Sequence, residues 1–244
     1  MKTALITGCN GGLGQRVLNK FAEQGYNIIA CSIIEDELFL KQCKELESTW
    51  GISITHIVYD STDIASLFDA LQRVENFNDE INVLVNCAGI NIMKPLLYTD
   101  LEDLQKTFTV NYFSAVLFAK KVAEKMVRQG NGVIVNVSSM GSMGHQPGGS
   151  CYDASKAAIN QFTISIAQEL APFGIRVNAV APAPINTPMF AQMPERAQKN
   201  LIKAVALKRP AEPDEVVCLI SFLASEDASY ITGQIIRIDG GAII

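Results

Sequence analysis

The segment Thr3-Ala4-Leu5-Ile6-Thr7-Gly8-Cys9-Asn10-Gly11-Gly12-Leu13-Gly14 decides the fold. It is a short apolar run that ends in a cluster of glycines, and the helical pattern Gln15-Arg16-Val17-Leu18 follows directly. Glycines in such a turn let the backbone approach a pyrophosphate, whose charge is attracted by exposed amides and by the positive end of the helix dipole. A loop that merely needs glycine is the simpler interpretation, but the place at a first strand-to-helix junction favours dinucleotide binding.

Short β-rich runs alternate with longer helical patterns along the rest of the chain, which is typical of repeated βαβ units around a parallel sheet. Several of the runs are continuously apolar, such as Val83-Leu84-Val85, as expected for strands buried on both faces. The predicted strands are Lys2–Thr7, Asn27–Cys31, Ser53–Val58, Asn82–Val85, Gly132–Val137, Arg176–Val180 and Gln234–Arg237. The predicted helices are Gly12–Gln24, Glu35–Trp50, Asp63–Phe77, Leu101–Gln129, Tyr152–Ala171 and Asp214–Ala224.

No linker, internal repeat or shift in composition marks a domain boundary. The chain has 244 residues, of which 48% are hydrophobic, so it is long enough to bury a large core. The sequence therefore predicts an α/β fold of the Rossmann type. We expect a single domain over residues 1–244, with a doubly wound parallel sheet of about seven strands and helices on both faces.

Charge and cysteine content exclude several classes of function. A net charge of −5 and a pI near 5.1 argue against a nucleic-acid partner, because no basic stripe is present to meet phosphates. No run is long and apolar enough for a signal peptide or a membrane span, so we expect a cytoplasmic protein. The six cysteines form no Cys-x-x-Cys pair and no metal-ligand cluster with His56 or His145, which predicts free thiols and no metal.

Tyr152 and Lys156 stand four residues apart in a predicted helix, so their side chains leave the same face one turn apart. A neighbouring ammonium should lower the pKa of a phenol from its reference value of about 10, which would make the tyrosine a better proton shuttle near neutrality. Taken alone, such a pair is more often an ordinary surface contact. Other motifs in the chain favour the catalytic interpretation.

The pattern Thr-Gly-x-x-x-Gly-x-Gly over Thr7–Gly14, combined with Tyr152-x-x-x-Lys156, resembles the short-chain dehydrogenase/reductase family. Further matches follow in the family's order over nearly the whole chain. They are Asn86-Cys87-Ala88-Gly89, where Cys87 replaces the family's second Asn, Asn136-Val137-Ser138-Ser139, Thr232-Gly233-Gln234 and Asp239-Gly240-Gly241.

The resemblance implies a catalytic set of Asn111, Ser139, Tyr152 and Lys156 for hydride transfer between a nicotinamide and a carbonyl or alcohol carbon. Tyr152 would pass the proton, Ser139 would hold the substrate oxygen, Lys156 would tune the phenol and bind the ribose, and Asn111 would anchor a water. Each of these residues also has a structural interpretation, for example a serine that simply ends a strand.

The resemblance also implies which residues bind NAD(H) or NADP(H). They are Gly8, Asn10, Gly12, Leu13, Gly14, Ser32, Asp60, Asn86, Ala88, Gly89, Tyr152, Lys156, Pro182, Ile185 and Thr187, with Asn86 expected to act largely as structural support. An acid at Ser32 would select NAD, and an arginine at Ile33 or Gly11 would select NADP. Neither is present. The absence of a nearby cation, with acids such as Glu35 following, favours NAD and leaves NADP open.

Within the family the chain most resembles bacterial 3-oxoacyl-(acyl-carrier-protein) reductases, through Gly174–Asn178 and Phe222–Gly241. Those enzymes place two basic residues toward the carrier; Arg128 matches one, but Phe173 replaces the other. The substrate is therefore either bound to an acyl carrier or a small molecule such as a sugar, polyol or other hydroxy compound. A protein that senses dinucleotides without turnover is a third alternative.

Three further expectations follow from the resemblance. We expect a homotetramer that packs through the helices Leu101–Gln129 and Tyr152–Ala171, and a variable lid over the substrate at residues 189–209. Where the family has Pro-Gly, the chain has Pro182-Ala183, so the turn beside the nicotinamide should differ. His145 is interpreted as a solvated loop residue rather than a catalytic one.

Overall fold

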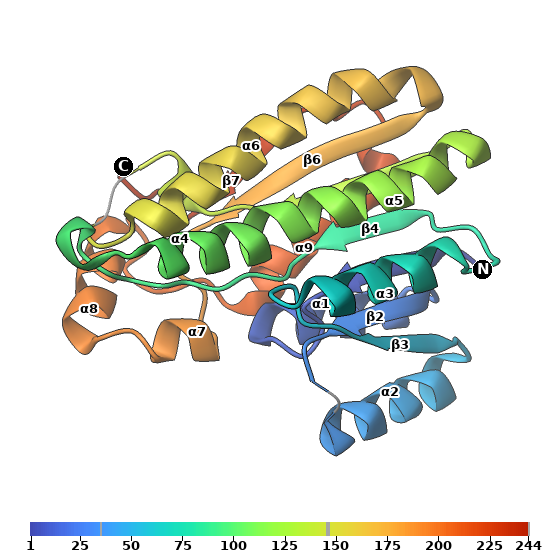
Figure 1. The fold of residues 1–244 in the computed structure, drawn as a ribbon, viewed down its shortest axis with the longest axis horizontal. Helices are drawn as coiled ribbons and strands as arrows, with labels where there is room; N and C mark the ends of the chain where they lie inside the picture. The colour runs from blue at the N-terminus through green and yellow to red at the C-terminus, as the bar shows by residue number, and fades with distance from the viewer. Residues whose placement is uncertain (35, 145–146, 244) are drawn as a thin grey trace.

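The computed structural model describes residues 1–34, 36–144 and 147–243, in which seven parallel strands form one sheet with helices on both faces (Figure 1). The strand order is β3-β2-β1-β4-β5-β6-β7, which confirms the predicted fold class. The strands are β1 (Thr3–Thr7), β2 (Asn27–Ser32), β3 (Ile54–Val58), β4 (Val83–Asn86), β5 (Gly132–Val137), β6 (Ile175–Pro182) and β7 (Ile235–Ile238). The order reverses between β1 and β4, where a doubly wound sheet opens a crevice for ligands.

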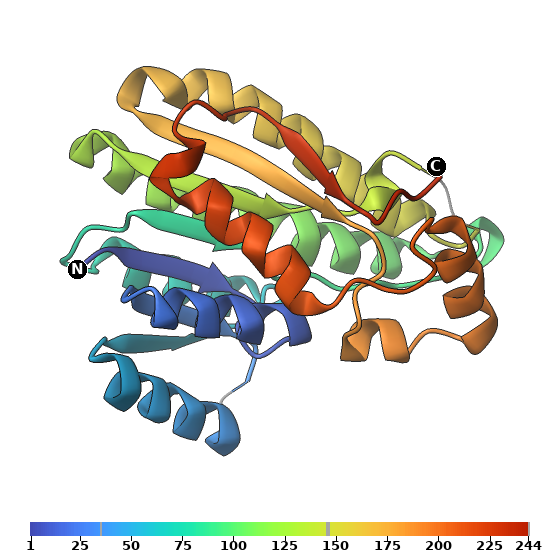
Figure 2. The same cartoon turned by 180° about the vertical axis from the view of Figure 1, so that it is seen from behind.

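The helices form two layers, seen from opposite sides in Figures 1 and 2. One face of the sheet is covered by α1 (Gly12–Glu23), α2 (Glu37–Trp50) and α9 (Pro213–Ala224), and the other by α3 (Ile64–Glu75), α5 (Ser114–Gln129) and α6 (Ser150–Leu170). At the carboxyl end of the sheet lie α4 (Leu101–Phe108), α7 (Pro188–Ala191) and α8 (Glu195–Ala204). Short 3-10 turns complete the described chain at η1 (Leu96–Tyr98), η3 (Met140–Ser142), η4 (Ala171–Phe173) and η5 (Glu226–Ala228).

Strand β1 explains why the apolar runs are continuous rather than alternating. All five of its residues are buried, and consecutive side chains enter different cores. Ile6 packs with Val17 and Phe21 of α1 on one face, whereas Leu5 belongs to the core that contains Phe118 of α5 on the other. Both faces of the sheet are therefore closed, and the strand ends are left to form the site.

The predicted helix Leu101–Gln129 is interrupted in the structure. Between α4 and α5 the chain widens into a π-helical turn, η2 (Thr109–Phe113), which adds one residue to the local hydrogen-bonded ring. Asn111 lies in this turn, and its side chain accepts a hydrogen bond from the Ile90 amide (2.8 Å) and donates one to the Ile90 carbonyl (3.0 Å). The wide turn thus directs Asn111 inward, away from the regular helical frame.

The start of α2 and the predicted lid also differ from the prediction. Helix α2 begins at Glu37 because Asp36 caps it by accepting a hydrogen bond from the Leu38 amide (3.0 Å); Glu35 lies outside the described residues. The predicted lid, residues 189–209, contains two helices, α7 and α8. In the described part of the chain, no helix has both the length and the apolar character needed to cross a bilayer.

Candidate active site

A cavity of about 1200 Å³ lies at the carboxyl ends of the strands. Its wall runs from Ser32 and Asp60 at one end, past the glycine turn, to Phe190 of α7 and Leu201 of α8 at the other. Most of the predicted site residues line it, namely Gly8, Asn10, Gly12, Leu13, Gly14, Ser32, Asp60, Ala88, Gly89, Ser139, Tyr152, Lys156, Pro182, Ile185 and Thr187. Asn86 and Asn111 are not among the lining residues.

The glycine turn has the shape that a bound diphosphate needs. Gly8 has a φ of +73°, and a Cβ there would lie 2.8 Å from the Cα of Ala88 at the end of β4. A Cβ on Gly14 would lie 2.0 Å from the carbonyl oxygen of Gly8, so the turn can close only without side chains. Gly11, the N-cap of α1, supplies no side-chain cap, which leaves the first amides of the helix for an anion in the cavity.

The side chain of Thr7 joins the carboxyl ends of β1 and β4. Its hydroxyl accepts hydrogen bonds from the amides of Cys87 (3.0 Å) and Ala88 (3.1 Å), which follow β4. This contact holds Ala88 and Gly89 against the glycine turn at the point where the strand order reverses. The residues around the turn therefore fit a dinucleotide along its length, from the crevice toward α6.

Tyr152 and Lys156 leave the first two turns of α6 on the same side and meet Ser139, which follows β5. The Ser139 hydroxyl lies near the Tyr152 phenol, whose pKa it lowers, and it accepts a hydrogen bond from the Gly141 amide (3.1 Å). The Lys156 ammonium lies 5.8 Å from the centroid of the Tyr152 ring and donates a hydrogen bond to the Val137 carbonyl (2.8 Å). The three side chains therefore share one wall of the cavity.

The prediction that Lys156 lowers the pKa of the Tyr152 phenol is wrong for this arrangement. The pKa of Tyr152 is raised above 10.0, chiefly because burial disfavours the phenolate, and the hydrogen bond from Ser139 offsets this only in part. Burial also lowers the pKa of Lys156 to about 8, so the protonated form of this side chain is only moderately favoured near neutral pH. Spacing predicted that the two groups are neighbours, but burial decides the sign of the shift.

The neighbouring serines have different environments. Ser138 is 3% exposed, and its hydroxyl donates to the Lys156 carbonyl (3.2 Å) in the backbone of α6. Ser139 presents its hydroxyl to Tyr152. Ser138 thus ties β5 to α6, and Ser139 is the serine that can contact a reacting oxygen.

The two asparagines outside the cavity wall are buried structural ties. The Asn86 amide group donates to Asn136 Oδ1 (2.9 Å) and to the Ala115 carbonyl (3.3 Å), linking β4 to β5 and α5. Asn111 also donates to the Ser155 hydroxyl (3.0 Å) of α6. A Cβ built on Gly89 would lie 3.4 Å from both Asn111 Oδ1 and Lys156 Nζ, so Gly89 lies beside both side chains.

At the far end of the cavity, Ser32 turns its hydroxyl into the protein. The side chain donates to the Ile34 carbonyl (2.8 Å) and is hydrogen-bonded to His56 Nε2 (2.7 Å), and the residue is only 1% exposed. Asp60 Oδ1 accepts hydrogen bonds from the amide (2.8 Å) and the hydroxyl (2.7 Å) of Thr62. Among the described lining residues, the charged side chains are Asp60, Lys106 and Lys156, so no described cation lines this end.

Sequence reasoning missed two features of the site. The carbonyl of Val137 orients Lys156. Because it is a backbone group, the type of side chain at this position could not predict the contact. Lys106 lines the cavity from α4, although a lysine in that helix gives the same signal as a solvated face. His145 lies outside the described residues.

Comparisons with known proteins agree with this geometry. The model of the family described as enoyl-(acyl carrier protein) reductase matches residues 8–242. The chain is 39% identical to a 3-oxoacyl-(acyl-carrier-protein) reductase of Thermotoga maritima over 100% of this chain and 98% of that protein. It is 38% identical to a 3alpha-hydroxysteroid dehydrogenase of Mediterraneibacter gnavus over 99% of this chain and 96% of that protein. A crystal structure from Beutenbergia cavernae with bound NADP at low occupancy superimposes with a TM-score of 0.91 at 28% identity, covering 98% and 96% of the two chains.

Proposed function

The chain belongs to the short-chain dehydrogenase/reductase family of NAD(P)-dependent oxidoreductases, and we propose that Tyr152, Ser139 and Lys156 are its catalytic residues for interconverting a carbonyl and a secondary alcohol. The observation that carries this proposal is that Ser139, Tyr152 and Lys156 line the same cavity as the glycine turn. When bound, a nicotinamide dinucleotide supplies or accepts the hydride.

In this proposal the chain's own residues handle the oxygen and its proton. The Ser139 hydroxyl holds the substrate oxygen beside the Tyr152 phenol, and Tyr152 donates its proton to that oxygen during reduction. A phenol is protonated at neutral pH, so Tyr152 can donate this proton, although burial raises its pKa and makes it a weaker acid. Lys156 would hold the nicotinamide ribose, and Asn111, which also lies beside Gly89, would support a path by which the proton is replaced.

We propose NAD(H) as the preferred cofactor, held by the residues predicted from the sequence that line the cavity. In either tautomer of His56, the single proton of the Ser32 hydroxyl is directed at a protein acceptor, so the side chain offers no donor to a 2′-phosphate. Asp60 adds a negative charge at the same end. Both features are less favourable for NADP(H) than for NAD(H).

Two substrate classes are proposed. The first is a 3-oxoacyl group on an acyl carrier, supported by the relative from Thermotoga maritima. The second is a free sugar, polyol or other small hydroxy compound, supported by the hydroxysteroid relative and by Phe173, which offers no second cation for an acidic carrier. Residues 189–209, with α7 and α8, form the proposed lid in both cases.

The decisive experiment is a panel of carbonyls and alcohols assayed with NAD(H) and NADP(H) in parallel. Acyl-carrier thioesters with a low apparent KM would support the first class, and free ketones or alcohols the second. Absence of cofactor turnover across the whole panel would contradict the catalytic proposal and favour a dinucleotide sensor. A lower KM for NADPH than for NADH would overturn the cofactor preference alone.

We also propose that the chain acts as a single domain and assembles as a homotetramer in the cytoplasm. The helices predicted to pack between subunits carry exposed apolar side chains, which supports an interface. They are Leu101, Leu104, Phe113 and Ile164. All six cysteines are free thiols, as expected in a reducing compartment.

A further inference from the structure

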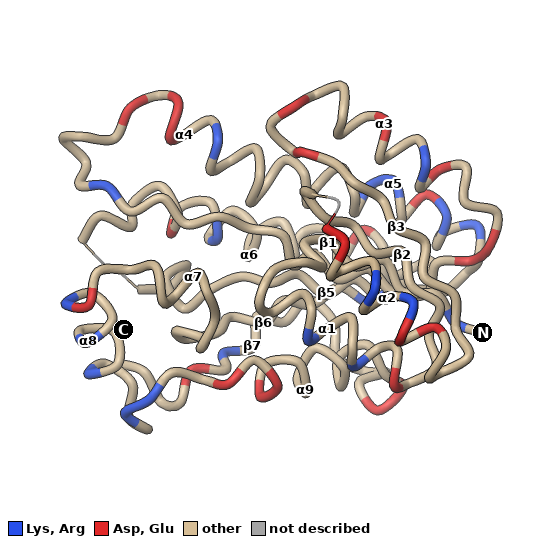
Figure 3. The backbone as a smooth tube through the Cα atoms, turned by 90° about the horizontal axis from the view of Figure 1, so that it is seen from below, with Lys and Arg blue, Asp and Glu red and all other residues tan. Residues whose placement is uncertain are grey.

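The end of the cavity beneath α7 and α8 has an unusual balance of side chains. Four of the chain's seven methionines line it, together with Phe190, Leu201 and Ile243. The lining methionines are Met93, Met140, Met189 and Met193. Because methionine is flexible and polarizable, such a wall adapts to apolar bodies of different shapes. Helix α7 is itself uncharged (Figure 3).

Lys106 is the one charged residue that the described wall presents at this end. Asp60 lies at the adenosine end, and Lys156 is 4% exposed and bonded to the Val137 carbonyl. Lys106 and Val110 stand four residues apart and both line the cavity, so Lys106, which is exposed to solvent, stands at the rim of the cavity. In Figures 1 and 3, α4 stands across the end of the sheet from α7 and α8.

Lys106 also has no partner among the described residues. Asp103 and Asp100 are paired with Lys94 (2.5 Å and 3.6 Å), and Glu102, one helical turn before Lys106, forms no ion pair with it within the described chain. No hydrogen bond or ion pair within the described chain engages Lys106 in the same way. A lysine beside an apolar wall, with its ammonium unpaired, is placed to receive an anion from a ligand in the cavity.

We propose that Lys106 binds an anionic group of the substrate, so that the enzyme takes carbonyl compounds in which an apolar body separates the reacting carbon from a carboxylate or a phosphate. This inference rests on the proposed function, because it assigns the substrate end of the same cavity. Lys106 acts as a specificity residue and takes no part in proton transfer.

The test uses matched pairs of substrates that differ only in charge. The probes are 5-oxohexanoate, 7-oxooctanoate and 9-oxodecanoate with their methyl esters, assayed with NADH at low ionic strength. We expect wild type to favour the carboxylate at one chain length by about three- to tenfold in kcat/KM, as for a partly exposed ion pair. Lys106→Gln should abolish the preference, and Lys106→Glu should reverse it toward the ester.

Controls separate a local contact from a general effect of charge. Lys44→Gln removes the same charge from exposed α2, away from the cavity, and should leave the preference unchanged. Raising the salt concentration should shrink the wild-type preference and leave the kcat/KM of the esters unaffected. A preference that is equal in wild type and Lys106→Gln overturns the proposal, even if the ketones are reduced.

A second pair distinguishes the two sources of the anion. Acetoacetyl-phosphopantetheine carries a phosphate, and acetoacetyl-N-acetylcysteamine lacks it. A loss in Lys106→Gln confined to the first compound identifies a phosphate, a loss confined to the oxo acids identifies a carboxylate, and no loss on either overturns the proposal.

A measurement of ligand binding makes the test of Lys106 independent of turnover. If no probe is reduced, none of them is a substrate, the proposed function is decided by the wider panel, and titration calorimetry of 9-oxodecanoate against the NADH-loaded protein still decides the role of Lys106. Tighter binding to wild type than to Lys106→Gln supports the proposal, and equal binding overturns it.

Discussion

Burial sets the chemistry of Tyr152. Because burial raises its pKa, the phenol stays protonated over the neutral range but gives up its proton less readily than a free phenol. Tyr152→Phe removes this proton and little else. We expect its turnover to fall by at least about a hundredfold, the low end for loss of general acid–base catalysis, while dinucleotide affinity stays nearly constant. Steady-state kinetics together with titration of NADH fluorescence would check both parts, and unchanged turnover would remove Tyr152 from the mechanism.

The buried ammonium of Lys156 should lower the free energy of unfolding. Its pKa falls from 10.5 in water to about 8 in the folded chain, so the burial penalty of the ammonium is complete below pH 8 and vanishes above pH 10.5. We expect Lys156→Met to be more stable than wild type by up to about 3 kcal/mol below pH 8, with the difference shrinking as pH rises toward 10.5. Urea unfolding at several pH values measures this, and a difference that grows with pH would contradict it.

At the level of single residues, the sequence predicted which residues line the site better than it predicted how burial changes their pKa values. Fixed spacings placed Ser139, Tyr152 and Lys156 on one wall, because a strand end and two helical turns leave little freedom. The sign of the Tyr152 shift was predicted wrongly, because no spacing reports how much protein surrounds a phenol. Lys106 was missed for the related reason that a lysine facing a cavity and one facing solvent follow the same helical period.

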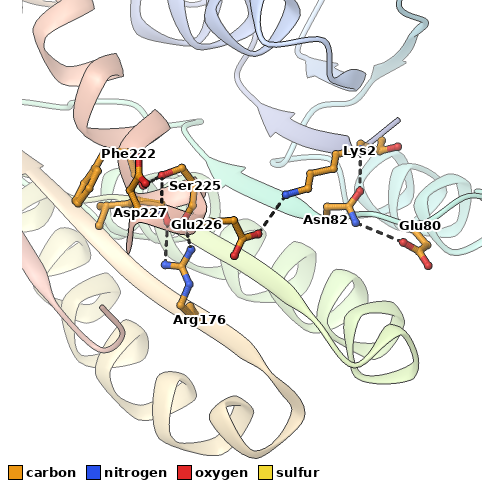
Figure 4. A network of polar contacts seen from close by, with 10 residues as sticks. Lys2, Glu80, Asn82, Arg176, Phe222, Ser225, Glu226 and Asp227 are labelled. Atoms are coloured by element: carbon orange, nitrogen blue, oxygen red, sulfur yellow. Dashed lines mark hydrogen bonds and ion pairs between the residues drawn. The ribbon is translucent and has the colours of Figure 1, made fainter. Parts of the chain in front are cut away.

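Among the elements, β6 depends on one side chain that joins it to the end of α9. Arg176 donates hydrogen bonds to the carbonyls of Leu223 (2.9 Å), Ser225 (2.8 Å) and Ile231 (3.3 Å), as Figure 4 shows for part of this network. Arg176→Met should leave the Leu223 carbonyl without this donor and lower the free energy of unfolding by about 1–3 kcal/mol, while the Ile231 carbonyl keeps its hydrogen bond from Asn178 (2.8 Å). Calorimetry should show a fall in Tm of roughly 2–4 °C for each kcal/mol lost.

Figure 4 also contains the matched control for this prediction. Lys2 and Glu226 form an exposed ion pair at 3.3 Å, near the same corner. Because exposed pairs contribute only about 0–1 kcal/mol, Glu226→Gln should leave Tm almost unchanged. Equal losses in Glu226→Gln and Arg176→Met would show that the carbonyl contacts are not the stabilising feature.

The sequence predicted the strands but missed two helices. All seven strands were predicted within a few residues, and those buried on both faces, such as β1 and β4, are marked by continuous apolar runs. Helices α7 and α8 were not predicted, since Pro188 and Pro194 suggest an irregular chain. In the structure they stand at the starts of these helices, where proline is well tolerated.

For the whole molecule, the proposed homotetramer can be tested at its predicted interface. Ile164 of α6 is 37% exposed although it is a large apolar side chain. Light scattering of wild type should give four chains of 26.5 kDa, about 106 kDa. Ile164→Glu should reduce this mass, because a carboxylate buried between subunits is strongly unfavourable.

Ile64 of α3 provides the control for this substitution. It is 69% exposed on a helix outside the predicted interface, so Ile64→Glu should keep the wild-type mass. A monomeric wild type would refute the assembly, and identical behaviour of the two variants would refute the choice of helices.

The wide turn at Thr109–Phe113 spreads one extra residue over a single helical turn. Deleting one residue here would therefore restore a regular helix in which α4 and α5 keep nearly the same phase. Phe118 and Val122 would stay in the core and Lys106 at the cavity, whereas Asn111 would return to the regular helical frame and lose its contacts with Ile90. A loss of one residue in this stretch should thus spare the packing and disturb the surroundings of Lys156.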